Sequence, residues 1–161
     1  MKKPRIDEKA VVADGAVVLG DVTIEKDVSI WYNAVIRGDV NSISIGEGTN
    51  IQDLAVLHVD ADASLAIGKN VTIGHGAILH GCTIKDQALI GMGAIVLNGA
   101  EIGKGSMIAA GALVPQNTVV PDGALYMGNP AKFRRMLTEE ELTANLKNAA
   151  NYIKESKDLN N

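Results

Sequence analysis

The sequence contains three histidines, His58, His75 and His80. Neutral imidazole nitrogens are common ligands of zinc and of other divalent transition metals, at metal–nitrogen distances of ~2.0–2.1 Å. A histidine on a protein surface is, taken singly, usually just a solvated polar group. Whether these three could hold a metal together depends on the elements that carry them.

A six-residue repeat runs from Ile6 to about Ala124. Each unit opens on an aliphatic residue, and a small or β-branched residue follows four places later. The openers are Ile6, Val12, Val18, Ile24, Ile30, Ile36, Ile45, Ile51, Leu57, Ile67, Ile73, Leu79, Ile84, Ile90, Val96, Ile102, Ile108, Val114 and Val120. The alternation within a unit is typical of a short strand, and glycines such as Gly74 and Gly76 allow the positive φ angles of corners.

These units predict an all-β solenoid. A six-residue unit cannot bury its apolar side alone, so the units must coil and stack. Three units per turn would give a triangular prism of about six coils, with neighbouring strands ~4.8 Å apart. An aliphatic interior fits the composition, which is 47% apolar but only 3% aromatic.

Sorting the units by prism face brings two of the histidines together. Arg37, His58 and His80 directly follow the openers of the sixth, ninth and twelfth units. They should therefore form an outward ladder on one face. His75 lies on the adjacent face and points away from this ladder. One metal could bind all three imidazoles only if His75 came from another copy, which predicts a homotrimer with one metal at each subunit interface.

The same sorting places polar side chains beside His75. Gln52 and Asp53 lie one coil below it, and Asp53 takes the place equivalent to His75 itself. Asn50 precedes Gln52 by two residues. A carboxylate that orients a histidine and an amide that positions water would support a metal centre here.

A second polar group accompanies His58. Arg37 lies one coil below it, with Asp39 two residues further on. Arg37 could bind an anionic substrate or product. Alternatively, Arg37 and Asp39 form a structural ion pair across the trimer seam, and the two interpretations are compatible.

The C-terminal part follows a different pattern. The sequence Thr138-Glu139-Glu140-Glu141 predicts a capping box, with Thr138 as N-cap. The residues Leu142, Leu146, Ala149, Ala150 and Ile153 then share one helical stripe. We expect a single domain, 1–161, with a β-helix over about 6–125 and a helix over about 139–156 that lies along the outside of a prism face, either of its own chain or of a neighbouring copy.

The bulk properties exclude several classes of protein. A formal net charge of −4 and a pI of about 5.3 argue against a nucleic-acid partner. No apolar run approaches the ~20 residues that span a membrane, and the charged start does not look like a signal peptide. The single Cys82 fits a reducing compartment and is best explained as a small apolar filler. We expect a cytoplasmic protein.

Several stretches resemble the signature of the gamma-class carbonic anhydrase family. They are Arg37-Gly38-Asp39, Asn50-Ile51-Gln52-Asp53, His58, and Gly74-His75-Gly76-Ala77-Ile78-Leu79-His80-Gly81. The resemblance implies a left-handed parallel β-helix that binds zinc, or alternatively ferrous iron or cobalt. In that family two histidines of one subunit and one of the next hold the metal, and the hydroxide made there converts carbon dioxide to bicarbonate.

The resemblance also implies roles for the polar residues. Gln52 would orient the hydroxide, and Asn50 would help to position carbon dioxide. Arg37 would pair with Asp53 between subunits and meet bicarbonate. Val40 and Ala61 stand where prototype members carry proton-shuttling glutamates in an acidic loop. Asp60 and Asp62 are then either candidates for proton transfer, in an enzyme of low activity, or simply solvated loop residues.

Three alternatives to a carbonic anhydrase remain open from the sequence. The same metal site could hydrolyse acyl-CoA thioesters. A hexapeptide-repeat acyltransferase would use a free histidine as general base and need no metal. A metal-stabilised scaffold would have no catalytic activity.

Overall fold

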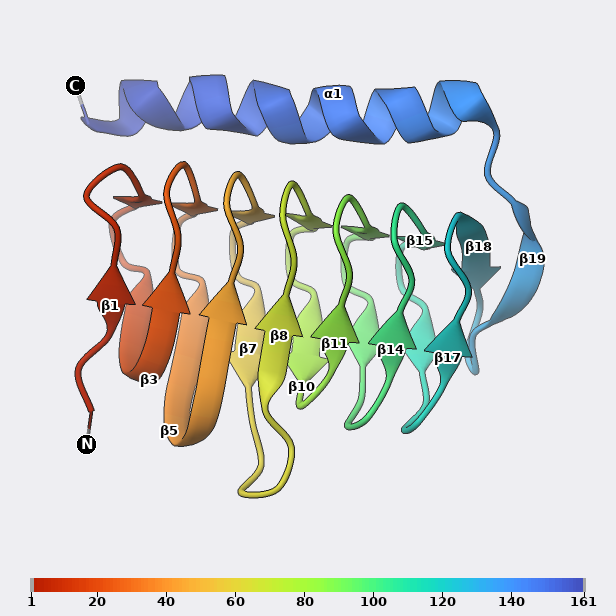
Figure 1. Ribbon diagram of the computed structural model, residues 1–161, viewed down its shortest axis with the longest axis horizontal. Helices are drawn as coiled ribbons and strands as arrows, with labels where there is room; N and C mark the ends of the chain where they lie inside the picture. The colour runs from red at the N-terminus through yellow and green to blue at the C-terminus, as the bar shows by residue number, and fades with distance from the viewer. Residues whose placement is uncertain (1, 161) are drawn as a thin grey trace.

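The computed structural model describes residues 2–160 as a left-handed parallel β-helix with one C-terminal helix (Figure 1). The predicted all-β solenoid is confirmed. Met1 and Asn161, the two ends of the predicted single domain, lie outside the described residues.

An eight-stranded sheet forms one face of the prism. Its strands are, in order, β2 (Val11–Val12), β4 (Ser29–Ile30), β6 (Asn50–Ile51), β9 (Thr72–Ile73), β12 (Leu89–Ile90), β15 (Met107–Ile108), β18 (Ala124–Met127) and β19 (Lys132–Met136). The strands up to β18 are parallel, and β19 closes the sheet antiparallel to β18. The solenoid makes about seven turns, one more than predicted. The additional turn contains β18, where Tyr126 takes the position of the aliphatic opener, so the six-residue pattern did not identify it.

An eleven-stranded sheet covers the other two faces. The long strands β3 (Val17–Ile24) and β5 (Val35–Ile45) each take part in both faces. The first half of β5 pairs with β7 (Val56–His58), and β10 (Ile78–His80), β13 (Ile95–Val96) and β16 (Leu113–Val114) continue this stack; together with the first halves of β3 and β5, these strands form what we call the histidine face. On the third face, the second half of β3 pairs with β1 (Arg5–Ile6) and that of β5 with β8 (Leu65–Ile67), and β11 (Thr83–Ile84), β14 (Glu101–Ile102) and β17 (Val119–Val120) continue the stack.

The repeat openers form the core. From Ile24 to Val120 every opener is buried, whereas Ile6 and Val12, in the first coil, remain 44% and 39% exposed. Complete burial of an aliphatic side chain stabilises a fold by about 1.5–3 kcal/mol. Leu57 and Leu79 are fully buried directly before the two histidines of the histidine face, so the core fixes the backbone from which these imidazoles project.

Helix α1 (Glu139–Ser156) runs back along the outside of the prism (Figure 1). The predicted capping box is present: Thr138 accepts a hydrogen bond from the Glu141 backbone, and the Glu141 carboxylate accepts one from the Thr138 backbone. The helix packs on the eight-stranded sheet of its own chain, against β4, β6 and β9, and a 3-10 turn, η1 (Lys157–Asn160), follows it.

The buried side of α1 differs from the predicted stripe. Ala149 is buried as expected, but Leu146 is 39% exposed and Ala150 is also exposed. In their place Asn148 donates a hydrogen bond to Thr72 of β9. The sheet below α1 offers polar partners as well as apolar ones, and that is why apolar periodicity alone misplaced the contact side.

Candidate metal centre

The histidine face carries the predicted ladder. Arg37 pairs with His58, and His58 pairs with His80, on successive parallel strands. The two imidazole centroids lie 5.0 Å apart, and Nδ1 of His58 lies 3.0 Å from Nε2 of His80. Two nitrogens bound to one tetrahedral metal at 2.0–2.1 Å would lie ~3.3 Å apart. The observed separation is close to that spacing.

Asp39 determines which nitrogen of His58 carries the proton. Burial acts to raise the pKa of Asp39, but hydrogen bonds from Arg37 and His58 outweigh it and hold the pKa below its usual value. Asp39 is therefore a carboxylate, which can only accept hydrogen bonds. Its Oδ1 lies 3.0 Å from Nε2 of His58, so Nε2 donates and Nδ1 of a neutral His58 has a free lone pair.

Asn98 has the same effect on His80, and it was not among the predicted site residues. Its Nδ2 donates to the Asp60 carboxylate, so its Oδ1 faces Nδ1 of His80. An amide oxygen accepts only, hence Nδ1 of His80 is the donor. The lone pair of His80 then lies on Nε2, the nitrogen that faces His58.

Two lone pairs therefore face each other across 3.0 Å, on Nδ1 of His58 and Nε2 of His80. Both outer nitrogens donate to fixed acceptors, which is the arrangement that orients histidine ligands in metal sites. Such a pair is repulsive unless a proton or a cation lies between the rings. The donor chemistry of this pair fits a divalent transition metal.

His75 lies elsewhere, at the corner that follows β9. Its Nδ1 is 2.9 Å from the Asp53 carboxylate, and its backbone N–H donates to Oε1 of Gln52 at 3.2 Å. With Nδ1 as donor, Nε2 of His75 has a free lone pair. The side chain is 43% exposed in the single chain.

The three histidines do not converge within one chain. In residues 2–160, no three His, Cys, Asp or Glu side chains lie close enough to hold one metal ion. His75 is separated from the pair on the histidine face, as the sorting by faces predicts.

A buried polar chain supports the base of His75. Gln52, 4% exposed, donates through Nε2 to Oδ1 of Asn50 at 3.0 Å. Asn50, 1% exposed, in turn donates to Oγ1 of Thr72 at 3.0 Å. Within the chain Asn50 is thus buried and hydrogen-bonded to both Gln52 and Thr72.

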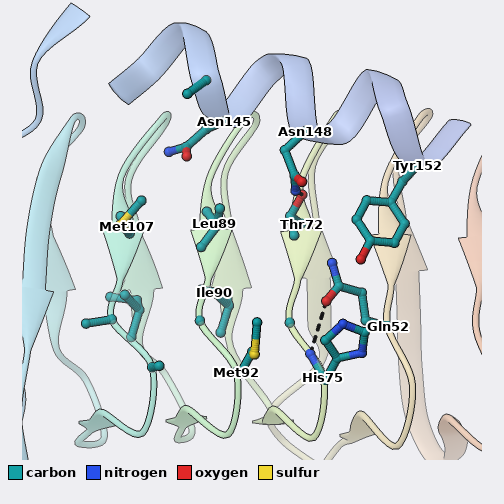
Figure 2. Close-up of a pocket in the computed structure, with 16 residues that line it drawn as sticks. Gln52, Thr72, His75, Leu89, Ile90, Met92, Met107, Asn145, Asn148 and Tyr152 are labelled. Atoms are coloured by element: carbon teal, nitrogen blue, oxygen red, sulfur yellow. Dashed lines mark hydrogen bonds between the residues drawn. The ribbon is translucent and has the colours of Figure 1, made fainter. Parts of the chain in front are cut away.

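A cavity of about 490 Å³ opens beside His75, between the eight-stranded sheet and α1 (Figure 2). Leu89 and Met107 contribute to its apolar lining. The Tyr152 hydroxyl points toward Gln52 at one end. Burial, followed by the nearby carboxylates of Glu155 and Asp53, raises the pKa of the Tyr152 phenol, which therefore remains a hydrogen-bond donor at neutral pH.

Comparison with known proteins identifies the family to which the chain belongs. The chain is 53% identical over 154 residues to a probable carbonic anhydrase of Methanocaldococcus jannaschii, covering 96% of this chain and 97% of the relative. The chain belongs to the gamma carbonic anhydrase family. It is also 51% identical over 159 residues to gamma carbonic anhydrase 2, mitochondrial, of Arabidopsis thaliana, covering 94% of this chain.

Other comparisons agree with the gamma carbonic anhydrase fold. Residues 81–116 match the model for bacterial transferase hexapeptide (six repeats). The crystal structure of a hexapeptide transferase family protein from Anaplasma phagocytophilum superposes with a TM-score of 0.93 at 50% identity, covering 96% of this chain and 91% of that one. Family membership implies a metal cofactor without saying which metal.

The chain spans only 57% of the length of the Arabidopsis relative, whose name also places it in mitochondria, so the cytoplasmic location stays a prediction. No helix in residues 2–160 is long and apolar enough to cross a membrane.

The remaining candidate residues differ in their contacts and burial. Arg37 pairs with Asp39 in its own chain, and its contact with Asp53 of another copy stays a prediction. Asp60 bonds Asn98, and Asp62 is exposed in the loop. Burial raises the pKa of the Cys82 thiol to about 12, in keeping with its role as a filler.

Proposed function

We propose that this protein is a metal-dependent carbonic anhydrase that converts carbon dioxide to bicarbonate at sites shared between the subunits of a homotrimer. The observation that carries the proposal is the pair of facing lone pairs on His58 and His80. Both rings are held with their outer N–H groups bonded, so the pair is ready to bind zinc, ferrous iron or cobalt.

The third ligand in this proposal is His75 of a neighbouring copy. Its Nδ1 faces the Asp53 carboxylate, which leaves Nε2 as the nitrogen for a metal, and its side chain is 43% exposed. Three copies related by a three-fold axis would present the His75 corner of each chain to the histidine face of the next. Each interface then completes one site.

The histidine face also supplies an apolar surface for such contact. One residue before each opener, an outward ladder crosses this face from end to end, formed by Val17, Val35, Val56, Ile78, Ile95 and Leu113. We call these six residues the apolar ladder. Val17, Val56 and Ile78 are 43%, 37% and 39% exposed in the single chain. A continuous apolar strip beside the metal-binding pair supports burial against another copy.

The bound metal supplies a nucleophile by lowering the pKa of water toward ~7. The residues of the chain then orient the reaction. Gln52 has one amide hydrogen beyond its bond to Asn50, and it lies beside the His75 backbone, so we assign it the orientation of the attacking oxygen. Asn50 acts by holding Gln52. Arg37, 45% exposed at the edge of the pair, is placed to attract bicarbonate.

The proton released by hydration must leave the site. Asp62 is exposed in the loop and carries a carboxylate, a group that can accept a proton, so we propose it as the proton-transfer residue of the loop. Asp60 is the second candidate, but its carboxylate already accepts a hydrogen bond from Asn98.

The test measures metal content and carbon dioxide hydration together. Protein purified without chelator should contain three metal ions per trimer and hydrate carbon dioxide in stopped-flow assays. His75→Ala should lose most of the metal and the activity, although it leaves His58 and His80 in place. A trimer that keeps its full metal content in His75→Ala would refute the shared site. A metal-free wild type with active acyl transfer would favour the acyltransferase.

A second candidate function is thioester hydrolysis at the same site. The cavity beside His75, about 490 Å³ with an apolar lining, is far larger than three-atom carbon dioxide requires. Volumes of ~300–1,000 Å³ are typical of sites for larger organic ligands. A panel of acyl-CoA substrates assayed with the metal-loaded trimer separates the two. A carbonic anhydrase should hydrate carbon dioxide without hydrolysing acyl-CoA. Hydrolysis of acyl-CoA without hydration of carbon dioxide would favour the thioesterase.

A further inference from the structure

We propose that Asn98 and Asp60 are positioning residues of the metal site, which fix the proton of His80 on Nδ1 and so present its Nε2 lone pair to the metal. This inference rests on the proposed metal site. It gives Asp60 a structural role in the site, different from the proton transfer considered from the sequence.

The orientation of the Asn98 amide follows from its two neighbours. Its Nδ2 faces the Asp60 carboxylate, and its Oδ1 faces Nδ1 of His80. A flipped amide would place its oxygen against the carboxylate and its NH₂ group against His80. That arrangement loses the bond to Asp60 and favours the wrong tautomer of His80.

The loop around Asp60 is itself held in place. Nδ2 of Asn41 donates to the backbone oxygens of Asp60 and Ala61, at 3.0 Å each. An antiparallel bridge joins Asp60 to Ala63. The carboxylate that orients Asn98 therefore belongs to a braced corner, and its position does not depend on a free loop.

The absence of a side chain at Gly81 leaves room for the Asn98 amide. Gly81 directly follows His80, and a Cβ at position 81 would lie 2.7 Å from Oδ1 of Asn98. On the next coil, Gln116 takes the place equivalent to Asn98, two residues after its opener, and it is exposed. Asn98 thus differs from its repeat equivalent by its contact with a metal-binding histidine.

The experiment compares Asn98→Ala with the matched surface variant Gln116→Ala, each as the intact trimer. Loss of a group that orients a metal-binding histidine typically weakens metal binding 10–100-fold. We expect Asn98→Ala to weaken Co²⁺ binding by about that factor, measured by chelator competition, and to change the visible spectrum of bound Co²⁺. Gln116→Ala should match the wild type in both.

Exchanging the amide and the carboxylate between positions 98 and 60 should restore Co²⁺ binding. Asn98→Asp alone puts two carboxylates together and should weaken Co²⁺ binding. Combined with Asp60→Asn, the new amide at position 60 can donate to the new carboxylate at position 98, which still accepts from Nδ1 of His80. The double variant should recover most of the affinity and the wild-type spectrum. Recovery would not be expected if Asn98→Asp acted only by unfolding the corner.

Two results would overturn the inference. One is an Asn98→Ala trimer whose Co²⁺ affinity and spectrum equal those of Gln116→Ala. The other is nitrogen NMR of the metal-free trimer showing that Nδ1 of His80 carries no proton in the wild type. The NMR result is independent of metal binding. A wild type that binds no Co²⁺ but carries its His80 proton on Nδ1 would refute the proposed function, while a metal-binding wild type with the other tautomer would refute only this inference.

Discussion

Gly81 lies directly against Asn98, so that a Cβ at position 81 would come within 2.7 Å of the Asn98 amide oxygen and 2.8 Å of the Ala63 Cβ. Gly81 also has a φ of +54°, a region that costs most other residues about 1–2 kcal/mol. Gly81→Ala should therefore reduce stability by roughly that amount and push Asn98 away from His80.

The consequence for the metal distinguishes Gly81 from other corner glycines. Gly111→Ala, at φ +68° with open space around the added Cβ, imposes a similar backbone cost without touching the site. Urea denaturation should show both variants destabilised, and Co²⁺ titration should show weaker binding for Gly81→Ala alone. Equal Co²⁺ affinities for the two would mean that Asn98 does not depend on the space at position 81.

The apolar ladder predicts how the subunits associate. Ile78 points outward on β10 beside His80 and is 39% exposed in the single chain. Ile78→Glu would bury an unpaired carboxylate in the proposed seam, at a cost of several kcal/mol. We expect the variant to sediment as a monomer and to lose its metal.

Val119→Glu is the matched control. Val119 is 64% exposed on β17, on the face that carries neither His58 nor His80. This variant should remain a metal-bound trimer in sedimentation and metal analysis. If Ile78→Glu also remains a trimer, the histidine face is not the seam.

The sequence predicted the solenoid well because its signal is repeated many times. Each coil depends on the same aliphatic opener, so an error at one unit does not change the others. The repeat also placed His58 on His80 correctly, because register in a stack of parallel rungs follows from counting residues. The position of Asp53 beside His75 followed from the same count.

The hydrogen bonds of the site could not be obtained by counting. The repeat is interrupted within β5 and again after β7, and at these two places Asp39 approaches His58 and Asp60 approaches Asn98. Asn98 looks like an ordinary Asn-Gly turn residue in the sequence. Only the three-dimensional path of the Asp60 loop brings a carboxylate to its amide and so links it to His80. Irregular loops lack the periodicity that made the rest predictable.

Cys82 offers a test of the core beside the site. It is 1% exposed, and burial raises the pKa of its thiol to about 12. Only the thiolate reacts readily with alkylating agents. Native protein at pH 8 should therefore resist iodoacetamide, while urea-unfolded protein should be labelled once per chain, as mass spectrometry can measure. Labelling of the native protein at the rate of a free thiol would contradict this burial.

The start of α1 should make stability depend on acid pH. Arg135 and the Thr138 backbone bond the Glu141 carboxylate and lower the pKa of Glu141 to about 2 in the folded chain, from a usual value of 4.5. A group whose folded pKa is depressed stabilises the fold above its unfolded pKa. That contribution is lost as the pH falls from about 4.5 toward 2.

Glu141→Gln removes the charge but keeps an amide that can serve in the capping box. Its melting temperature should lie below that of the wild type at pH 7, because the ion pair with Arg135 is gone. The difference should shrink as the pH falls below about 4.5 and be small by about pH 2, the folded pKa of Glu141, vanishing only below it. Glu140→Gln, which changes an exposed neighbour in the same first turn, controls for the effect of helix-end charge. A gap between Glu141→Gln and the wild type that stays constant from pH 7 to pH 3 would show that the ionised carboxylate of Glu141 contributes nothing to the fold.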